Sequence, residues 1–451
     1  MKPSRLRIQF LLLFIDIVLY FISIYVTLSV RYFSLASYDA FIIHIIYFIP
    51  LFIFQLVFFY LLNLYSLNYS YDFKTIVKKI SLVSIVILFS GFAFFYLYSA
   101  TIIFPKTILL LYTFFNSFFL LLWRRIFYKY TINSIRKPKI IFLGKSSSLP
   151  SLLNVFEENA YFNFEVITQY TTEKTDQDTY FPVTSSSKDL ISTGNQQICY
   201  IYSDSLKIDN ELKQFIYNEI AKGSVFYTYE DFYELIARKI PIESITDTWL
   251  IKNFQLGEKK IFFLLKRFFD ILLSLLGLLL FIPFWPFILL LIKIDSKGPA
   301  LYTQLRQGKD AKTFTIYKFR TMRLNNSEQP TTLNDTRITL VGRFLRNTRI
   351  DEIPQLINVL KGDLSLIGPR PERPELAEKL KLEVPYYQQR LLVRPGITGW
   401  DQVSGEYHSP SKEDTLKKLQ SDLYYIKNAS IILDISILLK TIYTVLKRSG
   451  R

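Results

Sequence analysis

The stretch KRFFDILLSLLGLLLFIPFWPFILLLIKIDSKGP, residues 266–299, decides how the C-terminal part of this 451-residue chain meets a membrane. Its apolar run is long enough to cross a bilayer, which takes about 20 helical residues. Pro283 and Pro286 lie in the middle of the run, and a proline inside a helix removes a backbone donor and breaks or kinks the helix. The sequence therefore predicts a broken apolar helix.

Both flanks of this helix are basic. Lys266 and Arg267 lie at its start, and Lys293 and Lys297 lie at its end. Because Lys and Arg concentrate on the cytoplasmic side of a membrane, we expect both flanks on that side. The prediction is a re-entrant helix that dips into the inner leaflet and returns. The alternative is a kinked fifth span, which would send the last ~150 residues to the opposite side.

Polar residues within the run have expected roles. The carbonyl groups freed at Pro283 need internal partners, and the Ser274 hydroxyl is one candidate. Asp270 is expected at the membrane interface, close enough to pair with Arg267.

Four further apolar segments precede this one, at residues 8–30, 41–65, 80–98 and 108–123. Each approaches the length of a membrane span. The basic residues cluster before the first segment, between the second and third, and after the fourth, so we expect both ends of this bundle in the cytoplasm. Asp16 lies inside the first segment. Because no chain of other polar residues that could pass an ion accompanies it, we expect Asp16 to make a helix–helix contact and not to line a transport path.

The composition limits the possible chemistry. Lys and Arg total 54 against 38 Asp and Glu, half of the residues are hydrophobic, and there is one cysteine and two histidines. A disulfide framework, a cysteine metal site and a Ser-His-Asp triad are therefore not expected. The net charge of +16 suits a membrane protein or a phosphate-bearing partner. No recognition motif supports a nucleic-acid partner.

Residues 131–257 have the pattern of an α/β domain. Apolar runs such as KIIFL, FEVITQY, ICYIY and SVFYTY alternate with helical stretches such as LKQFIYNEIAKG. This alternation predicts a Rossmann-like parallel sheet. The GxGxxG pattern is absent, because serines follow Gly144 and Lys145, and the turn is not a Walker A loop either. A scaffold or regulatory role is the simpler interpretation.

Residues 258–451 contain the chemical cluster. FTIYKFRTM predicts a strand that carries Lys318 and Arg320 on one face. In RIDEIPQLINVLKGDLSLIGPRPE, residues 349–372, Pro354 suits the first turn of a helix and Gly362 its end. Asp351 and Glu352 are therefore expected at a helix N-terminus, where they are either caps or reactive groups.

Arginines around the two acids favour the reactive interpretation. Arg346 and Arg349 precede the pair and Arg370 follows it, and arginines bind phosphates through two donors at once. An aspartate held ionised among such groups is suited to attack phosphorus. Such sites usually also need Mg²⁺. RPGITGW adds a glycine-rich loop with Arg394, backbone donors and an aromatic wall from Trp400.

Taken together, KRFFD before a proline-broken apolar helix, YKFRTM, the residues 349–372 and LLVRPGITGW resemble the bacterial sugar transferases. These are the polyprenyl-phosphate hexose-1-phosphate transferases, also described as monotopic phosphoglycosyl transferases. The resemblance covers residues from about 259 to the end, and the order of domains is similar to that of the large members of the family. It implies a membrane protein with an α-helical N-terminal bundle (1–130), an α/β Rossmann-like middle domain (131–257) and a mostly α-helical (α+β) membrane-associated catalytic domain with a re-entrant helix (258–451).

The resemblance also implies the reaction. Asp351 would attack the phosphorus next to the sugar of a UDP-sugar and release UMP, and undecaprenyl phosphate would then take the sugar phosphate from the enzyme. Glu352 would assist as an orienting group or base. Arg346, Arg370 and Lys318 match the phosphate-binding residues of the family, and Asp351 is the expected protein ligand of its Mg²⁺. The implied process is the first membrane step of capsule, exopolysaccharide or O-antigen synthesis, at the cytoplasmic face of the bacterial inner membrane.

Residues that match the family's motifs complete the expected site: Arg394, Gly396, Thr398 and Gly399 in the nucleotide-sugar loop, and Arg267, Asp270, Ser274 and Pro283 in the re-entrant helix. Glu406 departs from the basic residue that many members carry after the glycine of this loop. Glucose is favoured as the sugar and galactose comes next, and a homodimer is expected. A membrane-anchored scaffold and a glycosyltransferase that moves the sugar without its phosphate stay open. The released nucleotide separates the three: UMP for the transferase of a sugar phosphate, none for a scaffold, and UDP for a glycosyltransferase.

Overall fold

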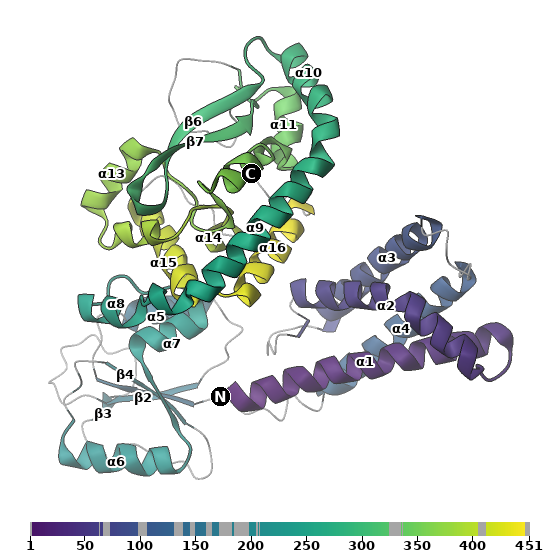
Figure 1. The fold of residues 1–451 in the computed structure, drawn as a ribbon. Coiled ribbons are helices and arrows are strands. Elements are labelled where there is room, and N and C mark those ends of the chain that lie inside the picture. Colours follow the sequence, from purple (N-terminus) through teal and green to yellow (C-terminus); the bar gives the residue numbers. More distant parts are fainter. Residues whose placement is uncertain are drawn as a thin grey trace. The chain divides into compact units, whose positions relative to one another are not determined.

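The computed structural model describes residues 2–62, 64–65, 73–97, 106–129, 139–144, 149–158, 165–170, 183–184, 198–203, 206, 208–323, 335, 337–404 and 412–446. The chain forms two compact units, Met1–Thr228 and Tyr229–Arg451. In Figure 1 the first unit runs from purple to teal and the second from teal to yellow.

Four apolar helices open the first unit: α1 (Lys2–Tyr32), α2 (Tyr38–Leu61), α3 (Phe73–Leu97) and α4 (Lys106–Phe127). Stretches of 21 to 24 residues within them are long and apolar enough to cross a membrane. Helix α1 packs against α2 and α4, and α3 packs against the same two. The predicted four-helix arrangement of apolar segments is confirmed.

Polar side chains join these helices internally. The Asp16 Oδ2 atom accepts hydrogen bonds of 2.8 Å from Arg124 Nη2 of α4 and from the Tyr65 hydroxyl. Between α4 and α2, Asn116 donates to the side chain of Gln55 at 2.7 Å. Asp16 and Arg124 are both fully buried, so the acid makes the helix–helix contact that its position predicts.

The middle of the chain forms a five-stranded parallel sheet. Its strands are β1 (Lys139–Leu143), β2 (Glu165–Tyr170), β3 (Val183–Thr184), β4 (Ile198–Tyr202) and β5 (Val225–Thr228), in the spatial order β3-β2-β1-β4-β5. Doubly wound folds use this order for their first five strands. Helices α5 (Leu149–Glu158) and α6 (Asn210–Ala221) belong to the same unit. The α/β prediction is confirmed, and Cys199, the one cysteine of the sequence, is buried in β4. The turn at residues 145–148 lies outside the described residues.

The second unit is mostly helical with two small sheets. Its helices are α7 (Tyr229–Ala237), α8 (Asp247–Asn253), α9 (Lys260–Phe281), α10 (Trp285–Asp295), α11 (Leu340–Asn347), α12 (Gln355–Lys361), α13 (Pro374–Glu383), α14 (Trp400–Val403), α15 (Lys412–Asn428) and α16 (Ile431–Leu446). Short 3₁₀ turns are η3 (Leu256–Lys259), η4 (Ile282–Phe284), η5 (Lys309–Ala311), η6 (Ile350–Glu352) and η7 (Tyr387–Leu392). Strands β6 (Leu301–Gln307) and β7 (Thr313–Phe319) form an antiparallel hairpin, and β8 (Ser365–Ile367) pairs in parallel with β9 (Gly396–Thr398).

The predicted break in the apolar helix is confirmed. Helix α9 ends at Phe281, the 3₁₀ turn η4 contains Pro283, and α10 follows from Trp285. The Ser274 hydroxyl is buried and has no hydrogen-bond partner among the described residues, so the expectation that it satisfies a freed carbonyl is wrong. Helix α9 packs closely on α12 near this residue: an added Cβ on Gly277 would lie 2.9 Å from Leu356.

Helix α9 is bonded to α12 and to β8. Arg267 donates to the carbonyl oxygens of Val359 at 2.6 Å and Leu360 at 3.0 Å, and Asp270 Oδ1 accepts from the Leu366 amide at 3.1 Å. Arg267 therefore bonds to carbonyls at the end of α12, and Asp270 bonds to a backbone amide of β8. The expected direct pair is wrong, because carbonyls left unpaired at the end of α12 take Arg267 and the β8 amide takes Asp270.

The far end of α10 is tied to the same unit. Asp295 Oδ2 accepts from the Val341 amide at the start of α11, at 2.9 Å, and Arg320 donates to the Ser296 carbonyl at 2.6 Å. Ile288, Ile292, Phe319 and Leu345 form a buried cluster beneath α10. Both ends of the broken helix are therefore fixed to one folded body.

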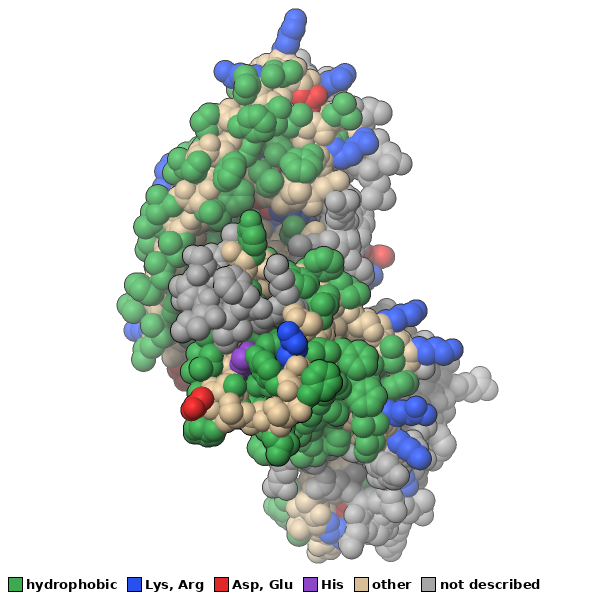
Figure 2. Space-filling view, turned by 90° about the vertical axis from the view of Figure 1, so that its right-hand side faces the viewer, with side chains coloured by type: hydrophobic (Ala, Val, Ile, Leu, Met, Phe, Trp, Pro, Cys, Tyr) green, Lys and Arg blue, Asp and Glu red, His purple; other side chains and the backbone are tan. Residues whose placement is uncertain are grey.

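The outer side of α9 and α10 is apolar and exposed. Exposed hydrophobic side chains of the two helices include Ile261, Leu264, Phe268, Leu272, Leu279, Leu280, Phe284, Phe287, Leu290 and Ile294. Leu340 and Phe344 of α11 and Ile432 of α16 are exposed as well. In the space-filling view of Figure 2, hydrophobic side chains cover much of the described surface that faces the viewer. Such a surface is unstable in water and suits a lipid environment.

The main core of the second unit includes residues upstream of the broken helix. Ile240, Ile242 and Leu250 share a buried cluster with Leu423 and Ile437 of the C-terminal helices. In α7, Glu234 accepts hydrogen bonds from Lys427 and Asn428 of α15. Segments as early as α7 and α8 therefore pack with the C-terminal helices. The domain boundary at residue 257 stays a prediction.

Candidate active site

The two adjacent acids lie in a tight turn between α11 and α12. Arg349 has a left-handed backbone with φ of +55°, and Asp351 and Glu352 follow it in η6. A left-handed conformation is uncommon for a residue with a side chain and is often found at functional sites. Helix α12 then starts after Pro354 and ends at Gly362, whose φ is +94°. The predicted helix start and end are confirmed, and the acids lie in the 3₁₀ turn just before the helix.

Glu352 is surrounded by cations. Its Oε1 atom accepts a 2.8 Å hydrogen bond from Lys318 Nζ and lies 3.5 Å from Arg370 Nη2, and its Oε2 atom lies 3.8 Å from Arg349 Nη1. Burial would raise the pKa of Glu352, but Lys318, Arg370 and Arg349 together hold that pKa below its usual value. Glu352 is therefore ionised, and its oxygens are occupied by the three cations around it.

Asp351 is the opposite case. It is buried, and it accepts no hydrogen bond from the described residues; its Oδ1 atom is without a partner. Burial and the neighbouring charge of Glu352 raise the pKa of Asp351, against the opposing effect of Lys318, Arg346 and Arg349. A carboxylate that is poorly solvated and unbonded is a stronger nucleophile than one held by donors.

Lys318 reaches the pair from strand β7. Asn358 joins this strand to α12: its side chain accepts from the Tyr317 amide at 3.2 Å and donates to the Thr315 carbonyl at 2.7 Å. This fully buried asparagine therefore fixes the distance between the strand that carries Lys318 and the turn that carries Glu352. Arg320, at the end of the same strand, contacts the end of α10 and not the acids.

Arg346 is positioned by the packing of α11 on the segment after β7. Its Nε atom donates to Thr321 Oγ1 at 2.9 Å, and its charge lies close enough to affect Asp351. Gly342 permits this packing, because a Cβ atom there would meet the Thr321 carbonyl at 2.0 Å. Arg346 therefore lies beside Asp351, as expected for a residue of the same site.

The glycine-rich loop packs behind the loop that carries Arg370. Gly396 and Thr398 lie in β9, beside β8, and Gly399 precedes α14. A Cβ on Gly396 would meet the Gly368 amide at 2.1 Å, and a Cβ on Gly399 would meet the Gly368 carbonyl at 2.5 Å. These two glycines therefore permit close backbone packing against Gly368.

The other residues of this loop differ in exposure. Arg394 is exposed, and the Thr398 hydroxyl is 2.8 Å from that of Thr441. Trp400 is only 5% exposed and donates to the Arg238 carbonyl, so the expected open aromatic wall is wrong. Hydrophobic packing in the core takes the indole ring out of reach of a substrate. Glu406, which departs from the family pattern, lies outside the described residues.

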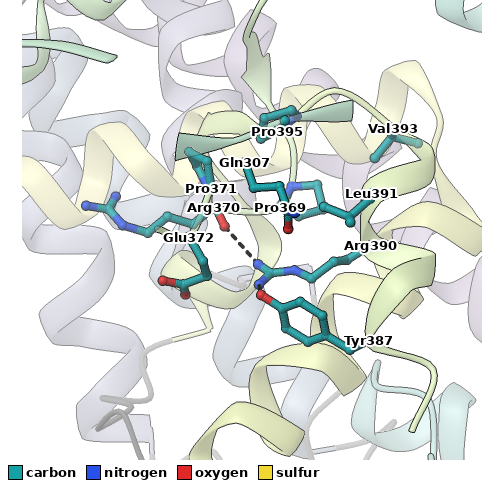
Figure 3. Close-up of a pocket in the computed structure, with 11 residues that line it drawn as sticks. Gln307, Pro369, Arg370, Pro371, Glu372, Tyr387, Arg390, Leu391, Val393 and Pro395 are labelled. Carbon is teal, nitrogen blue, oxygen red and sulfur yellow. Dashed lines mark hydrogen bonds between the residues drawn. The ribbon is translucent and has the colours of Figure 1, made fainter. Parts of the chain in front are cut away.

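Two buried charged residues behind the site escaped the sequence analysis. Arg390 and Asp422 form an ion pair of 2.9 Å, and Arg390 also donates to the Arg370 carbonyl at 2.8 Å. Figure 3 shows Arg390 in the pocket beside the loop Pro369–Arg370–Pro371. No local pattern marks the role of Arg390, because the Arg370 carbonyl and Asp422 lie 20 and 32 positions away. Asn358 had a weak signal, as a polar residue within the apolar pattern of α12.

The expected Mg²⁺ is compatible with the residues present. Among the described residues no three His, Cys, Asp or Glu side chains form a cluster that could hold a metal. However, protein-bound Mg²⁺ often uses one or two carboxylates together with water and substrate phosphates. The partnerless Oδ1 atom of Asp351 supplies such a carboxylate oxygen, while Glu352 is occupied by its cations.

The chain is similar to several known proteins. A stretch of 202 residues is 44% identical to the UDP-N-acetylgalactosamine-undecaprenyl-phosphate N-acetylgalactosaminephosphotransferase of Aeromonas hydrophila, and it covers 44% of this chain and 48% of that protein. The chain thus spans about half the length of this relative.

Two other relatives match over more of their length. The undecaprenyl-phosphate galactose phosphotransferase of Salmonella typhimurium is 32% identical over 340 residues, which is 70% of each chain. The UDP-glucose:undecaprenyl-phosphate glucose-1-phosphate transferase of Klebsiella pneumoniae is 33% identical over 319 residues, 68% of this chain and 67% of that protein.

Residues 261–448 match the family described as bacterial sugar transferase, and they contain both acids, the surrounding cations and the broken helix. The match within this range and the long alignments with the two relatives from Salmonella typhimurium and Klebsiella pneumoniae agree with the motifs of the sequence. The chain belongs to the bacterial sugar transferase family.

Proposed function

We propose that the chain transfers a sugar 1-phosphate from a UDP-sugar to undecaprenyl phosphate and releases UMP. The observation that carries this proposal is the unequal pair of acids: Glu352 is held by three cations, and Asp351 has no hydrogen-bond partner among the described residues. The names of the relatives, which are phosphotransferases acting on undecaprenyl phosphate, support the same reaction.

In the first step, an oxygen of the Asp351 carboxylate attacks the phosphorus that bears the sugar. A bond forms between this oxygen and phosphorus, the bond from phosphorus to the bridging oxygen breaks, and UMP leaves with the electron pair. In the second step, a phosphate oxygen of undecaprenyl phosphate attacks the same phosphorus and Asp351 leaves. The product is undecaprenyl-diphosphate-sugar, and Asp351 returns to its starting state.

The remaining residues bind and orient the phosphates. Arg370 and Arg349, which contact Glu352 at 3.5 and 3.8 Å, have donors left for phosphate oxygens. Glu352 keeps these cations beside Asp351. A bound Mg²⁺, held by Asp351 and the diphosphate, would offset the negative charge on the phosphates.

The sugar is the part of the proposal with the most candidates. The relatives carry glucose, galactose and N-acetylgalactosamine in their names. Glucose is the first donor to test, as the sequence predicts, and the other two UDP-sugars belong in the same experiment.

The attachments of the broken helix support the proposed membrane arrangement. The start of α9 and the end of α10 are both bonded to the same folded unit, through Arg267 and Asp295. A helix that crosses a bilayer separates its ends by about 30 Å of hydrocarbon, which suits these attachments poorly. This supports a re-entrant helix, with the site on the cytoplasmic face. The homodimer stays a prediction.

The test uses the purified full-length chain in lipid nanodiscs with undecaprenyl phosphate and Mg²⁺. UDP-glucose, UDP-galactose and UDP-N-acetylgalactosamine are supplied in turn, and released UMP and UDP are measured separately. UMP from at least one donor, with a covalent phosphosugar adduct on Asp351, is the expected result. Release of UDP instead would indicate a conventional glycosyltransferase, and release of neither nucleotide would favour a scaffold.

A further inference from the structure

The buried ion pair between Arg390 of η7 and Asp422 of α15 lies behind the proposed site. Their side chains are 6% and 4% exposed, and Arg390 Nη2 lies 2.9 Å from Asp422 Oδ2. Burying two charges is expensive, and a hydrophobic pair of similar volume is often as stable. General stability therefore does not explain why an ion pair is buried at this place, and its location behind the proposed site suggests a role there.

Besides its ion pair with Asp422, Arg390 donates to the loop that carries Arg370 and to Tyr387. Its Nη2 atom donates to the Arg370 carbonyl at 2.8 Å, and its Nη1 atom donates to the Tyr387 hydroxyl at 2.9 Å. In Figure 3 the Arg390 guanidinium meets the backbone of Arg370, whose own side chain extends to the opposite side of the loop. Arg390 thus contacts the backbone of Arg370 and not its guanidinium.

The two following carbonyls are held as well. Arg306 donates to the Pro371 carbonyl at 3.2 Å, and the Gln307 amide donates to the Glu372 carbonyl at 2.9 Å. Pro369 and Pro371 have no amide hydrogen to offer, so carbonyl bonds must fix this segment. The Gly396 amide also donates to the Pro369 carbonyl, at 2.9 Å. The loop is therefore bound at four successive carbonyls, and Arg390 provides the attachment at Arg370.

On its free side, Arg370 points to the acids, with Nη2 3.5 Å from Glu352 Oε1. A misplacement of about 1 Å at a positioning group can lower a rate by about 100-fold. We propose that Arg390, oriented by Asp422, is a positioning residue that fixes the backbone of Arg370 and so holds its guanidinium on Glu352 and on the substrate phosphate. The role toward the phosphate rests on the proposed function, and the role toward Glu352 does not.

The first experiment is a double-mutant cycle on UMP release. Arg390→Lys keeps a positive charge beside Asp422 but cannot reach all three partners of the guanidinium at once. We expect it to lower kcat/KM by about 10- to 100-fold. In the Arg370→Met background the same change should cost less than about 2-fold, because residues that act through one another are not additive. Equal losses in both backgrounds would overturn the proposal.

A second variant separates a loss of activity from a loss of folding. Arg390→Met with Asp422→Leu removes both charges together and strands neither. We expect this pair of changes to lower kcat/KM like Arg390→Lys while the melting temperature stays near that of the parent. Parental activity in a folded double variant would contradict the positioning role.

The second experiment needs no turnover. Phenylglyoxal modifies arginine side chains, and mass spectrometry gives the rate for each arginine. Arg349 is a matched internal control, because its side chain is 37% exposed like that of Arg370 and also lies near Glu352. In Arg390→Lys the rate at Arg370 should rise several-fold relative to Arg349. An unchanged ratio would overturn the proposal even if the chain released no UMP from any donor.

Lys427→Met is the matched control variant. It breaks another ion pair of the same unit, 2.6 Å from Lys427 to Glu234, whose side chains are 16% and 11% exposed. Kinetics and the ratio of modification rates should both match the parent. A change in the ratio here as large as in Arg390→Lys would mean that the loop responds to any loosening of the unit, which contradicts a specific role for Arg390.

Discussion

Two buried aspartates of this protein are treated in opposite ways by their surroundings. Asp16 of the helical bundle receives two hydrogen bonds on one oxygen, from Arg124 and Tyr65. Asp351 receives none from the described residues, although three cations lie around the adjacent Glu352. Both acids are buried, so burial alone does not distinguish a structural acid from a reactive one.

The difference lies in which carboxylate the cations bind. In the bundle a single arginine neutralises a single acid, and the pair joins α1 to α4. In the second unit the cations bind the neighbour and leave the reactive oxygen without a donor. The positive charges around Glu352 thus favour the binding of an anion beside Asp351. Asp351 itself stays poorly solvated, as catalytic groups often are. The following predictions test this comparison.

The largest effect is expected for Asp351→Asn. The amide cannot attack phosphorus, so UMP release and the covalent adduct should both fall by at least about 1,000-fold. Burial raises the pKa of Asp351, so this residue favours folding below its ordinary pKa and loses that contribution as the pH rises through the raised value. At pH 7.5 the melting temperature of the variant should therefore equal or exceed that of the parent. Near-parental UMP release would exclude Asp351 as the nucleophile.

Lys318→Met should have the next largest effect. It removes the closest cation, at 2.8 Å from Glu352, and leaves that buried carboxylate with its two arginines. We expect kcat to fall by about 100- to 1,000-fold, which is the loss typical of removing one group that stabilises charge in the transition state. Lys361→Met is the control, since Lys361 contacts Tyr317 on the outside of the same strand. If both variants lost the same activity, a specific role of Lys318 would be refuted.

The pH dependence should report Asp351 and not Glu352. Burial and the charge of Glu352 raise the pKa of Asp351 to about 6, so kcat/KM should fall about tenfold per pH unit below that value. Burial would raise the pKa of Glu352, but Lys318 and the arginines hold it low, so this acid stays ionised over the same range. In Lys318→Met the acid limb should move to higher pH, because Lys318 lowers the pKa of Asp351. A limb that stays in place would assign it to another group.

Most of this architecture could be predicted from the sequence, because it rests on local patterns. The length of the apolar segments, Pro283 in the broken helix, and Pro354 and Gly362 at the ends of α12 each act through their own backbone. The acids and Arg346 could be placed in one site because they are close in sequence. The contacts that were predicted wrongly or not predicted at all are long-range. Arg267 bonds to α12 instead of Asp270, and Arg390 bonds to a loop 20 positions away. Such pairings depend on how helices pack, which no local pattern specifies.

The smallest effect on turnover is expected in the bundle. Asp16→Asn leaves Arg124 buried without its anion and should destabilise the bundle. The lower bound on the loss is roughly 0.6 kcal/mol, the value of a typical polar contact inside a membrane. The upper bound is roughly 3 kcal/mol, the cost of a buried charge that has lost its partner. Replacing both residues, with Asp16→Leu and Arg124→Leu, should restore most of that stability. UMP release per folded molecule should stay within about 2-fold of the parent in both cases, because this pair binds no reacting group. If Asp16→Asn abolished turnover while the bundle remained folded, Asp16 would belong with Asp351, and the number of donors on a carboxylate would no longer separate structural acids from reactive ones in this protein.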